Sequence, residues 1–126
     1  MTIFHIGFPK SASTTLQKQL FDKHSQINFM GIYPTSNIGN DSNDKNTNTL
    51  YLKNSSLKEF HNCLTNMEGI EYEFSYVNDH FEAVKSLMSS EKVNVFSNER
   101  FASVLFAHKD RAQKAQRIKY FFPEAK

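Results

Sequence analysis

The chain has a single cysteine, Cys63, in 126 residues, which excludes an internal disulfide framework. Such a composition is typical of proteins from reducing compartments. No apolar run comes near the roughly 20 residues of a membrane-spanning helix. The opening MTIFHIGFPK has neither the basic start nor the long apolar core of a secretory signal. We therefore expect a soluble, cytoplasmic protein with no membrane span.

An excess of charge is lacking too. The 15 Lys and Arg residues nearly balance the 13 Asp and Glu residues, for a net charge of +2, so composition gives no reason to expect nucleic-acid or membrane-surface binding. His24, His61 and His80 lack the paired spacing of metal ligands, and we predict no metal site. Phenylalanine, in contrast, is abundant at 12 residues, which supplies bulky material for the core of one domain.

Hydrophobic periodicity predicts an alternation of strands and helices. Extended segments are expected at 2–6, 27–34 and 92–99, and helices from Ser13 to about 22–25, from Ser56, from Asp79 and over 110–121. This order is typical of α/β proteins with a parallel sheet. Because two clear strand patterns are fewer than a sheet covered on both faces needs, we expect an incomplete parallel sheet flanked by helices.

The middle and last helices carry further expectations. Two patterns with capping-box spacing mark helix starts, at Ser56 and at Asp79. The apolar stripes that follow are predicted to face the core: Leu57, Phe60, Leu64 and Met67, then Phe81, Val84, Leu87 and Met88. In the last helix we expect inward-facing Ala112, Ala115, Ile118 and Phe122, and a solvated basic face.

Residues 35–49, TSNIGNDSNDKNTNT, are almost entirely small and polar. Their side chains compete with the backbone for hydrogen bonds and offer little to bury, which predicts a loop. A long loop inside a compact domain often lies beside a ligand site. A tolerated surface insertion explains the composition equally well.

The most informative stretch is HIGFPKSASTTLQKQLF, residues 5–21, which joins the first strand to the first helix. The first amides of a helix have no partner within it, and the helix dipole favours negative charge there. Glycine permits the exit from the strand, small residues allow a phosphate to approach the backbone, and a lysine and several hydroxyls add donors. We predict an anion site built from Gly7, Pro9, Lys10, Ser11, Ala12, Ser13, Thr14 and Thr15.

The stretch does not have the nucleotide-binding pattern G-x-x-x-x-G-K-[ST], in which the lysine directly precedes the helix. Here the lysine follows the glycine by three residues and is preceded by proline. IGFPKSASTTLQ instead resembles the 5′-phosphosulfate-binding loop of the PAPS-dependent sulfotransferases, commonly P-K-[ST]-G-[ST]-T. The matching positions are Pro9, Lys10, Ser11, Ser13 and Thr14, whereas Ala12 stands where the family usually has glycine.

Two weaker similarities point to the same family. Residues 93–102, VNVFSNERFA, are similar to the family's second core strand, whose end carries the catalytic base, and residues 117–126 to the segment that leads into its third strand. The resemblance implies a P-loop-type fold and sulfuryl transfer from PAPS (3′-phosphoadenylyl sulfate) to a hydroxyl or amine of a carbohydrate or other small molecule. It assigns Lys10 to the departing phosphate and Glu99 to the role of base.

The resemblance covers the N-terminal part of such a domain. The segments that hold the 3′-phosphate and adenine in the family would follow Lys126, so residues 1–126 are interpreted as part of a single sulfotransferase-like domain without its C-terminal half. We expect transfer only from a chain that contains those segments. We also expect an exposed sheet edge that is able to pair with another strand.

Other interpretations stay open at this point. The loop also fits an ordinary strand-to-helix turn with a helix cap, a non-catalytic anion-binding remnant, or a divergent P-loop kinase, although the kinase lysine position and a Mg²⁺ carboxylate are missing. Glu99 also fits an ion pair with Arg100, and cytosolic members of the resembling family typically use histidine as the base. His5 and Cys63 are expected to be structural residues.

Overall fold

The sheet is small, parallel and central. The computed structural model describes residues 1–7, 13–31, 49–67, 72–102 and 111–126. Its three strands, β1 (Thr2–His5), β2 (Ile27–Phe29) and β3 (Val93–Ser97), pair in the order β1-β3-β2, and both pairings are parallel. The expected α/β class is confirmed, and each predicted extended segment contains one of the strands.

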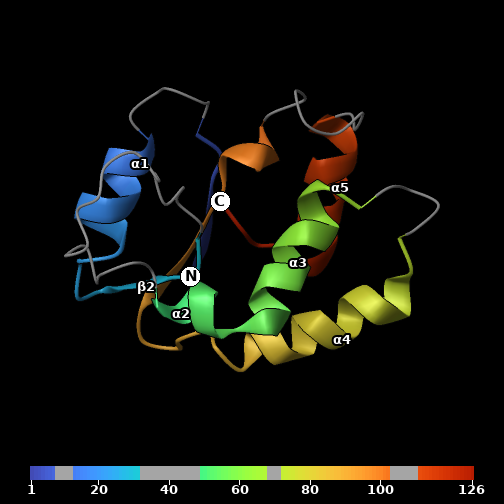
Figure 1. Cartoon of the computed structure of the whole chain (residues 1–126), viewed down its shortest axis with the longest axis horizontal. Coiled ribbons are helices and arrows are strands. Elements are labelled where there is room, and N and C mark those ends of the chain that lie inside the picture. The colour runs from blue at the N-terminus through green and yellow to red at the C-terminus, as the bar shows by residue number, and fades with distance from the viewer. Residues whose placement is uncertain (8–12, 32–48, 68–71, 103–110) are drawn as a thin grey trace, which may run out of the picture.

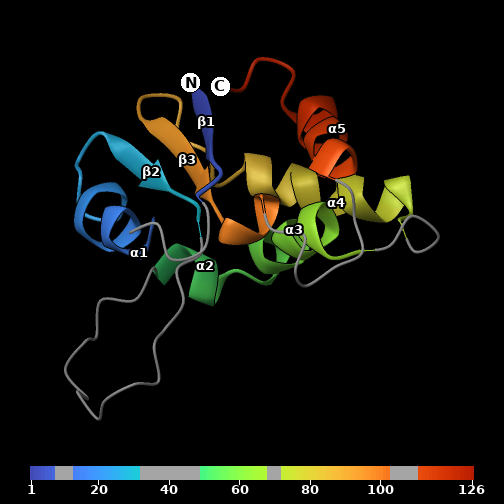
Figure 2. The same ribbon diagram turned by 90° about the horizontal axis from the view of Figure 1, so that it is seen from above.

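Helices cover both faces of this sheet. Their bounds are α1 Ser13–Leu16, η1 Gln17–Phe21, α2 Thr49–Lys53, α3 Ser55–Thr65, α4 Phe74–Lys85, η2 Glu99–Phe101 and α5 Arg111–Phe121. Figure 1 and Figure 2 show α1 on one side of the strands and α3, α4 and α5 on the other. The strands therefore form the middle layer of three.

Side-chain alternation along β1 and β3 divides the core between the two faces. Phe4 and Phe96 point toward α3, α4 and α5, where their rings stack with centroids 5.0 Å apart and each lies 5.1 Å from the ring of Phe122. Ile3 and Val95 point the other way, into a smaller cluster that includes Phe21 and Phe29. The predicted stripe of α3 is confirmed, since Leu57, Phe60 and Leu64 are fully buried and Met67 packs against them.

Two helices begin earlier than the sequence patterns predicted. The cap of α3 is Asn54, whose Oδ1 accepts a hydrogen bond from the Leu57 amide at 2.8 Å, so the capping box at Ser56 was wrong. The expected start of α4 at Asp79 was also wrong, because the helix begins at Phe74. That residue already stacks on Phe121, so tertiary packing rather than the local cap sets this boundary.

The basic face of α5 differs most from expectation. Ala112 and Ala115 are exposed, whereas Lys114 is buried and its Nζ donates to the Arg100 carbonyl at 2.7 Å. Arg117 donates to the carbonyls of Cys63 and Met67 at 2.8 Å each. Long cationic side chains bury their stems while their head groups reach carbonyl oxygens, so a pattern of alanines and cations misled the assignment. Ile118 and Phe122 do pack in the core, as predicted.

Two asparagines, Asn28 and Asn94, form a hydrogen-bond network at the amino end of the sheet. Asn94, on β3, accepts at Oδ1 from Asn28 and from the Ser89 amide, both at 2.8 Å, and donates from Nδ2 to the Ser89 carbonyl at 2.9 Å. Asn28 also donates to the Leu87 carbonyl at 2.9 Å. These bonds hold the turn after α4 against the first residues of β2 and β3.

The outer edge of β1 is partly paired. The Lys126 amide donates to the Thr2 carbonyl at 3.2 Å, and the Phe4 amide donates to the Lys126 carbonyl at 2.8 Å. These two bonds follow the parallel ladder pattern, and Figure 2 shows both chain ends side by side at this edge. Of the predicted polar loop, Thr49 belongs to α2 and the rest lies outside the described residues.

Candidate active site at the carboxyl edge

The predicted site residues meet at the carboxyl edge of the sheet as far as the structure describes them. β1 and β3 are adjacent and parallel, with His5 and Ser97 as register partners, so the segments after both strands leave the same edge. Gly7 follows β1, Ser13, Thr14 and Thr15 are the first residues of α1, and Glu99 is the first residue of η2. Pro9, Lys10, Ser11 and Ala12 lie outside the described residues.

The helix that follows the loop changes from an α-helix to a π-helix after its first turn. The 4 residues of α1 continue into 5 residues of π-helix, marked by a bond from the Asp22 amide to the Gln17 carbonyl. Leu16 and Leu20 are exposed at 40% and 42%, while Gln17 is fully buried. A polar side chain thus occupies the face that an apolar one would normally take, and π-helical turns of this kind occur frequently at functional sites.

Gln17, Ser97 and His5 form a short hydrogen-bond chain across this edge. The Gln17 Nε2 donates to the Ser97 Oγ at 2.7 Å, and the Ser97 Oγ lies 2.8 Å from the His5 Nδ1. Gln17 and Ser97 are both fully buried. The Phe21 ring meets the His5 ring edge-on at 5.2 Å, which fixes the plane of the imidazole. The Ser97 hydroxyl is therefore a buried link between Gln17 and His5.

One buried atom of these three side chains has no hydrogen-bond partner among the residues that the structure describes. The Gln17 Oε1 is buried and accepts no hydrogen bond from any residue that the structure describes. Leaving such an acceptor unsatisfied costs about 1–3 kcal/mol. Unsatisfied buried groups are rare in native proteins, and sites of function are one place where they persist.

Glu99 is held in place by the residues on either side of it. Asn98 caps η2, since its Oδ1 accepts from the Arg100 amide at 2.9 Å. The Asn98 Nδ2 lies 3.4 Å from the Nδ1 of His61, whose Nε2 is 2.8 Å from the Met30 carbonyl. Because a carbonyl only accepts, His61 carries its proton on Nε2 and accepts from Asn98 at Nδ1.

Two further contacts anchor the same turn. The ring of Phe101 is buried, stacks on His61 with centroids 5.6 Å apart and meets Phe4 edge-on at 5.4 Å. From α5, the buried Lys114 holds the Arg100 carbonyl. A turn anchored from α3, β1 and α5 presents Glu99 in a fixed position with its side chain partly exposed, as preorganised chemistry requires.

Gly31 is required for the close approach of the chain after β2. A Cβ at this position would lie 2.6 Å from the Ser97 carbonyl oxygen, 2.7 Å from the Ser97 nitrogen and 2.6 Å from the Phe29 ring. Two of these neighbours are backbone atoms that cannot move aside independently of β3. Glycine here therefore keeps the end of β3, and with it Ser97, in its place.

Burial controls the titration of the groups near this edge. It lowers the pKa of His5, an effect that the Glu99 carboxylate opposes by raising it. Burial lowers the pKa of His61 to about 4, against the raising effect of its bond to Met30. Burial likewise raises the pKa of the Cys63 thiol to about 11, so Cys63 is a buried thiol and not a nucleophile.

Most of this network was not predicted from the sequence. Gln17 was noted only as part of the resemblance, His5 was assigned a structural role, and His61 was considered only as a metal ligand. A usable signal was the polar pair Ser97–Asn98, directly after the buried strand β3. Polar residues at the carboxyl ends of parallel strands converge on the place where α/β proteins bind ligands.

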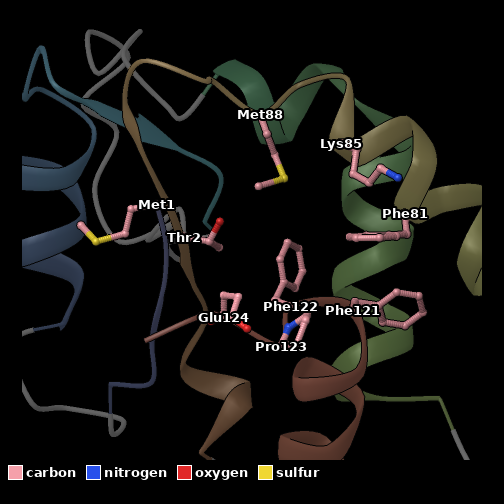
Figure 3. A pocket seen from close by; sticks show the side chains of 10 residues that line it. Met1, Thr2, Phe81, Lys85, Met88, Phe121, Phe122, Pro123 and Glu124 are labelled. Carbon is pink, nitrogen blue, oxygen red and sulfur yellow. The ribbon is translucent and has the colours of Figure 1, made fainter.

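An apolar pocket of about 350 Å³ lies at the opposite end of β1 and belongs to a different region. Met1 and Thr2 line it together with residues of α4, α5 and the segment after α5. Figure 3 shows Met88, Phe81 and Phe122 around its interior. Because its strand residues come from the amino end of β1, this pocket is not part of the candidate site.

Comparisons with known proteins give no family assignment: no protein-family model, no curated protein and no solved structure matches the chain. Within the described ranges, no helix is both long enough and apolar enough to cross a membrane. In the same part of the chain, no three His, Cys, Asp or Glu side chains are grouped in a way that could hold a metal ion.

Proposed function

We propose that the carboxyl edge of the sheet binds the 5′-phosphosulfate group of PAPS and that the protein transfers the sulfuryl group to an acceptor hydroxyl or amine. One observation supports this most: β1 and β3 are adjacent and parallel, so the loop with the sulfotransferase-like sequence and Glu99 leave the same edge. A P-loop-type sheet in a cytoplasmic protein is part of the same proposal.

The donor set at this edge suits an anionic group. Helix α1 begins directly after the loop, and the first amides of a helix favour negative charge. A helix of four residues would not be an anion site by itself, so the proposal depends on the loop sequence as well. By the sequence resemblance, Lys10 and the hydroxyls of Ser11, Ser13 and Thr14 would add donors.

The proposed roles follow general acid–base and electrostatic principles. When bound, PAPS supplies the sulfuryl group and a phosphate leaving group. Glu99 takes the proton of the acceptor hydroxyl as the acceptor oxygen bonds to sulfur. The sulfur–oxygen bond to the 5′-phosphate breaks, its electron pair stays on the phosphate oxygen, and Lys10 stabilises that charge. The acceptor is a carbohydrate or another small molecule that reaches the partly exposed Glu99.

The test is sulfuryl transfer from PAPS by the full-length protein and its Lys10→Ala variant. We expect the variant to lose about 10²-fold or more in turnover, the usual effect of removing one oxyanion-stabilising donor. The matched control is Lys23→Ala, which removes an exposed lysine just after η1 whose Nζ donates to the Gln19 Oε1 at 2.9 Å, and it should leave turnover unchanged.

Two other results would replace the proposal. PAPS binding without transfer to any hydroxyl or amine acceptor would indicate an anion-binding remnant. Mg²⁺-dependent ATP binding that is tighter than PAPS binding would indicate a divergent kinase. Undiminished turnover by Lys10→Ala would contradict the assignment of the loop.

A further inference from the structure

His61 joins the segments that follow two of the strands. Its ring projects from α3 and is buried. The His61 Nε2 lies 2.8 Å from the carbonyl oxygen of Met30, the residue after β2. Its Nδ1 lies 3.4 Å from the Nδ2 of Asn98, the residue after β3. One imidazole therefore connects the chain beyond β2 to the chain beyond β3 at the carboxyl edge.

The contacts determine the hydrogens of this link from both sides. The Met30 carbonyl can only accept, so the His61 Nε2 carries a hydrogen and donates it. The Asn98 Oδ1 accepts from the Arg100 amide at 2.9 Å, so the nitrogen of the Asn98 amide faces the ring. That nitrogen is a donor, so the Nδ1 of the ring is its acceptor and the ring is neutral.

The same ring contacts the turn around Glu99 at a second point. Phe101 stacks on the imidazole with centroids 5.6 Å apart and an interplanar angle of 22°. Asn98 caps η2 and Phe101 is the last residue of that helix, so His61 contacts both of its ends. The ring of Tyr51 meets the imidazole edge-on at 5.5 Å and restricts its tilt.

We propose that His61 is a positioning residue for Glu99. This inference rests on the proposed function, in which Glu99 takes the proton of the acceptor. The Asn98 side chain caps η2 only while its oxygen faces the Arg100 amide, and the neutral ring favours that orientation by accepting from the amide nitrogen. The cap sets where η2 begins, and with it the place of the Glu99 carboxylate.

Two amide variants separate the two hydrogen bonds of His61. In His61→Asn the short side chain replaces the Nδ1, so its oxygen accepts from Asn98 while the bond to Met30 is lost. The longer side chain of His61→Gln reaches the Nε2 position and donates to Met30, but it leaves Asn98 without its acceptor. Both variants lose the stack on Phe101, so a comparison between them isolates the bond to Asn98.

The readout is the kcat of PAPS turnover by the full-length protein. Because a misplacement of about 1 Å can cost about 100-fold in rate, we expect His61→Gln to lose about 10-fold or more in kcat. His61→Asn should stay within about 3-fold of the wild type, and the KM for PAPS should change little in either variant. Equal kcat values in the two variants, lowered or not, would overturn the inference.

A control and a double-mutant cycle test the route through Glu99. The matched control is Thr65→Val, which removes a buried hydroxyl of α3 that donates to the His61 carbonyl at 2.8 Å, and it should leave kcat unchanged. In a Glu99→Gln background, His61→Gln should cause no further loss of kcat. A further loss of about 10-fold in that background would show that His61 acts elsewhere and would overturn the inference.

Hydrogen exchange of the Arg100 amide, measured by NMR, gives a readout that does not depend on turnover. The amide should exchange faster in His61→Gln than in the wild type or in His61→Asn, and equal exchange in all three proteins would overturn the inference. Asn98→Ser is a further variant should the His61 variants fail to fold. Serine keeps a cap for η2 but is too short to reach the ring, so kcat should fall as in His61→Gln.

The outcomes distinguish this inference from the proposed function. Undiminished kcat in a folded Asn98→Ser variant, with turnover that still depends on Lys10, overturns the role of His61 alone. Absence of Lys10-dependent turnover in the wild type overturns it together with the proposed function.

Discussion

Each end of the parallel sheet holds a buried polar network, and the two differ in what their atoms are bonded to. At the amino end, both amide atoms of Asn94 are used, in bonds with Asn28 and Ser89. At the carboxyl end, Gln17 uses its nitrogen on Ser97 and leaves its oxygen without a partner among the described residues. The first network contains only amides and backbone groups, whereas the second includes titratable side chains.

This difference separates a structural network from one suited to chemistry. A buried network whose members satisfy one another rigidifies the fold and has nothing left to offer a ligand. The carboxyl end has a buried amide oxygen without a partner among the described residues, a histidine under the influence of a carboxylate, and a turn anchored from three sides around Glu99. The buried Gln17 oxygen departs from the rule that buried polar atoms are hydrogen-bonded, and such departures are expected at functional sites.

The largest predicted effect is the acid sensitivity of the carboxyl end. His61 has a pKa of about 4 in the folded protein and an ordinary value of 6.5, so the unfolded chain takes up the proton first. Its contribution to stability is complete above pH 6.5 and is lost as the pH falls through 4. The loss approaches about 3 kcal/mol. Urea unfolding across this pH range should show that the free energy of unfolding of the wild type falls as the pH falls, and that it falls less steeply in His61→Gln. Equal pH dependence in the two proteins would contradict the assignment.

Gly31→Ala should be nearly as damaging, because its Cβ would meet backbone atoms of Ser97 at 2.6 and 2.7 Å. Overpacking of this kind costs about 2–3 kcal/mol. Urea midpoints measure the loss, and the variant should also bind PAPS more weakly, since Ser97 must move. A midpoint equal to that of the wild type would show that β2 and β3 separate easily at this end.

Asn94→Ala tests the amino end by itself. The variant removes three hydrogen bonds of about 1 kcal/mol each and leaves the Ser89 amide and carbonyl without these partners, so we expect a loss of about 2–3 kcal/mol in the free energy of unfolding. PAPS affinity should stay at the wild-type value. A loss of affinity in this variant, at a temperature where it is fully folded, would mean that the two ends are not independent.

The smallest effect on stability is predicted for Gln17→Leu. The substitution removes one hydrogen bond, and it also removes the buried oxygen that has no partner among the described residues. The free energy of unfolding should therefore change by less than about 1 kcal/mol, in either direction. A loss of several kcal/mol would show that the Gln17 amide is a structural group like that of Asn94.

The features that could be predicted from the sequence are those that depend on residues close together in the chain. The strands and the junction at Ser13 were predictable, because alternation and a run of small polar residues are properties of neighbouring positions. The start of α4 and the burial of Lys114 were not, because both depend on aromatic rings and carbonyls supplied from distant segments. Of the site, Glu99 was predicted at the edge where it lies, whereas the bond between Gln17 and Ser97 joins residues far apart in the chain.

The most direct test of the central claim is a calorimetric titration of PAPS into the full-length protein, the Lys10→Ala variant and the Lys23→Ala control. The carboxyl-edge site predicts saturable binding to the wild type and to the control. It predicts binding about 10- to 100-fold weaker in Lys10→Ala, the loss of one charge-assisted hydrogen bond. No binding to the wild type, or equal binding by Lys10→Ala, would contradict the claim that this edge holds a phosphosulfate group.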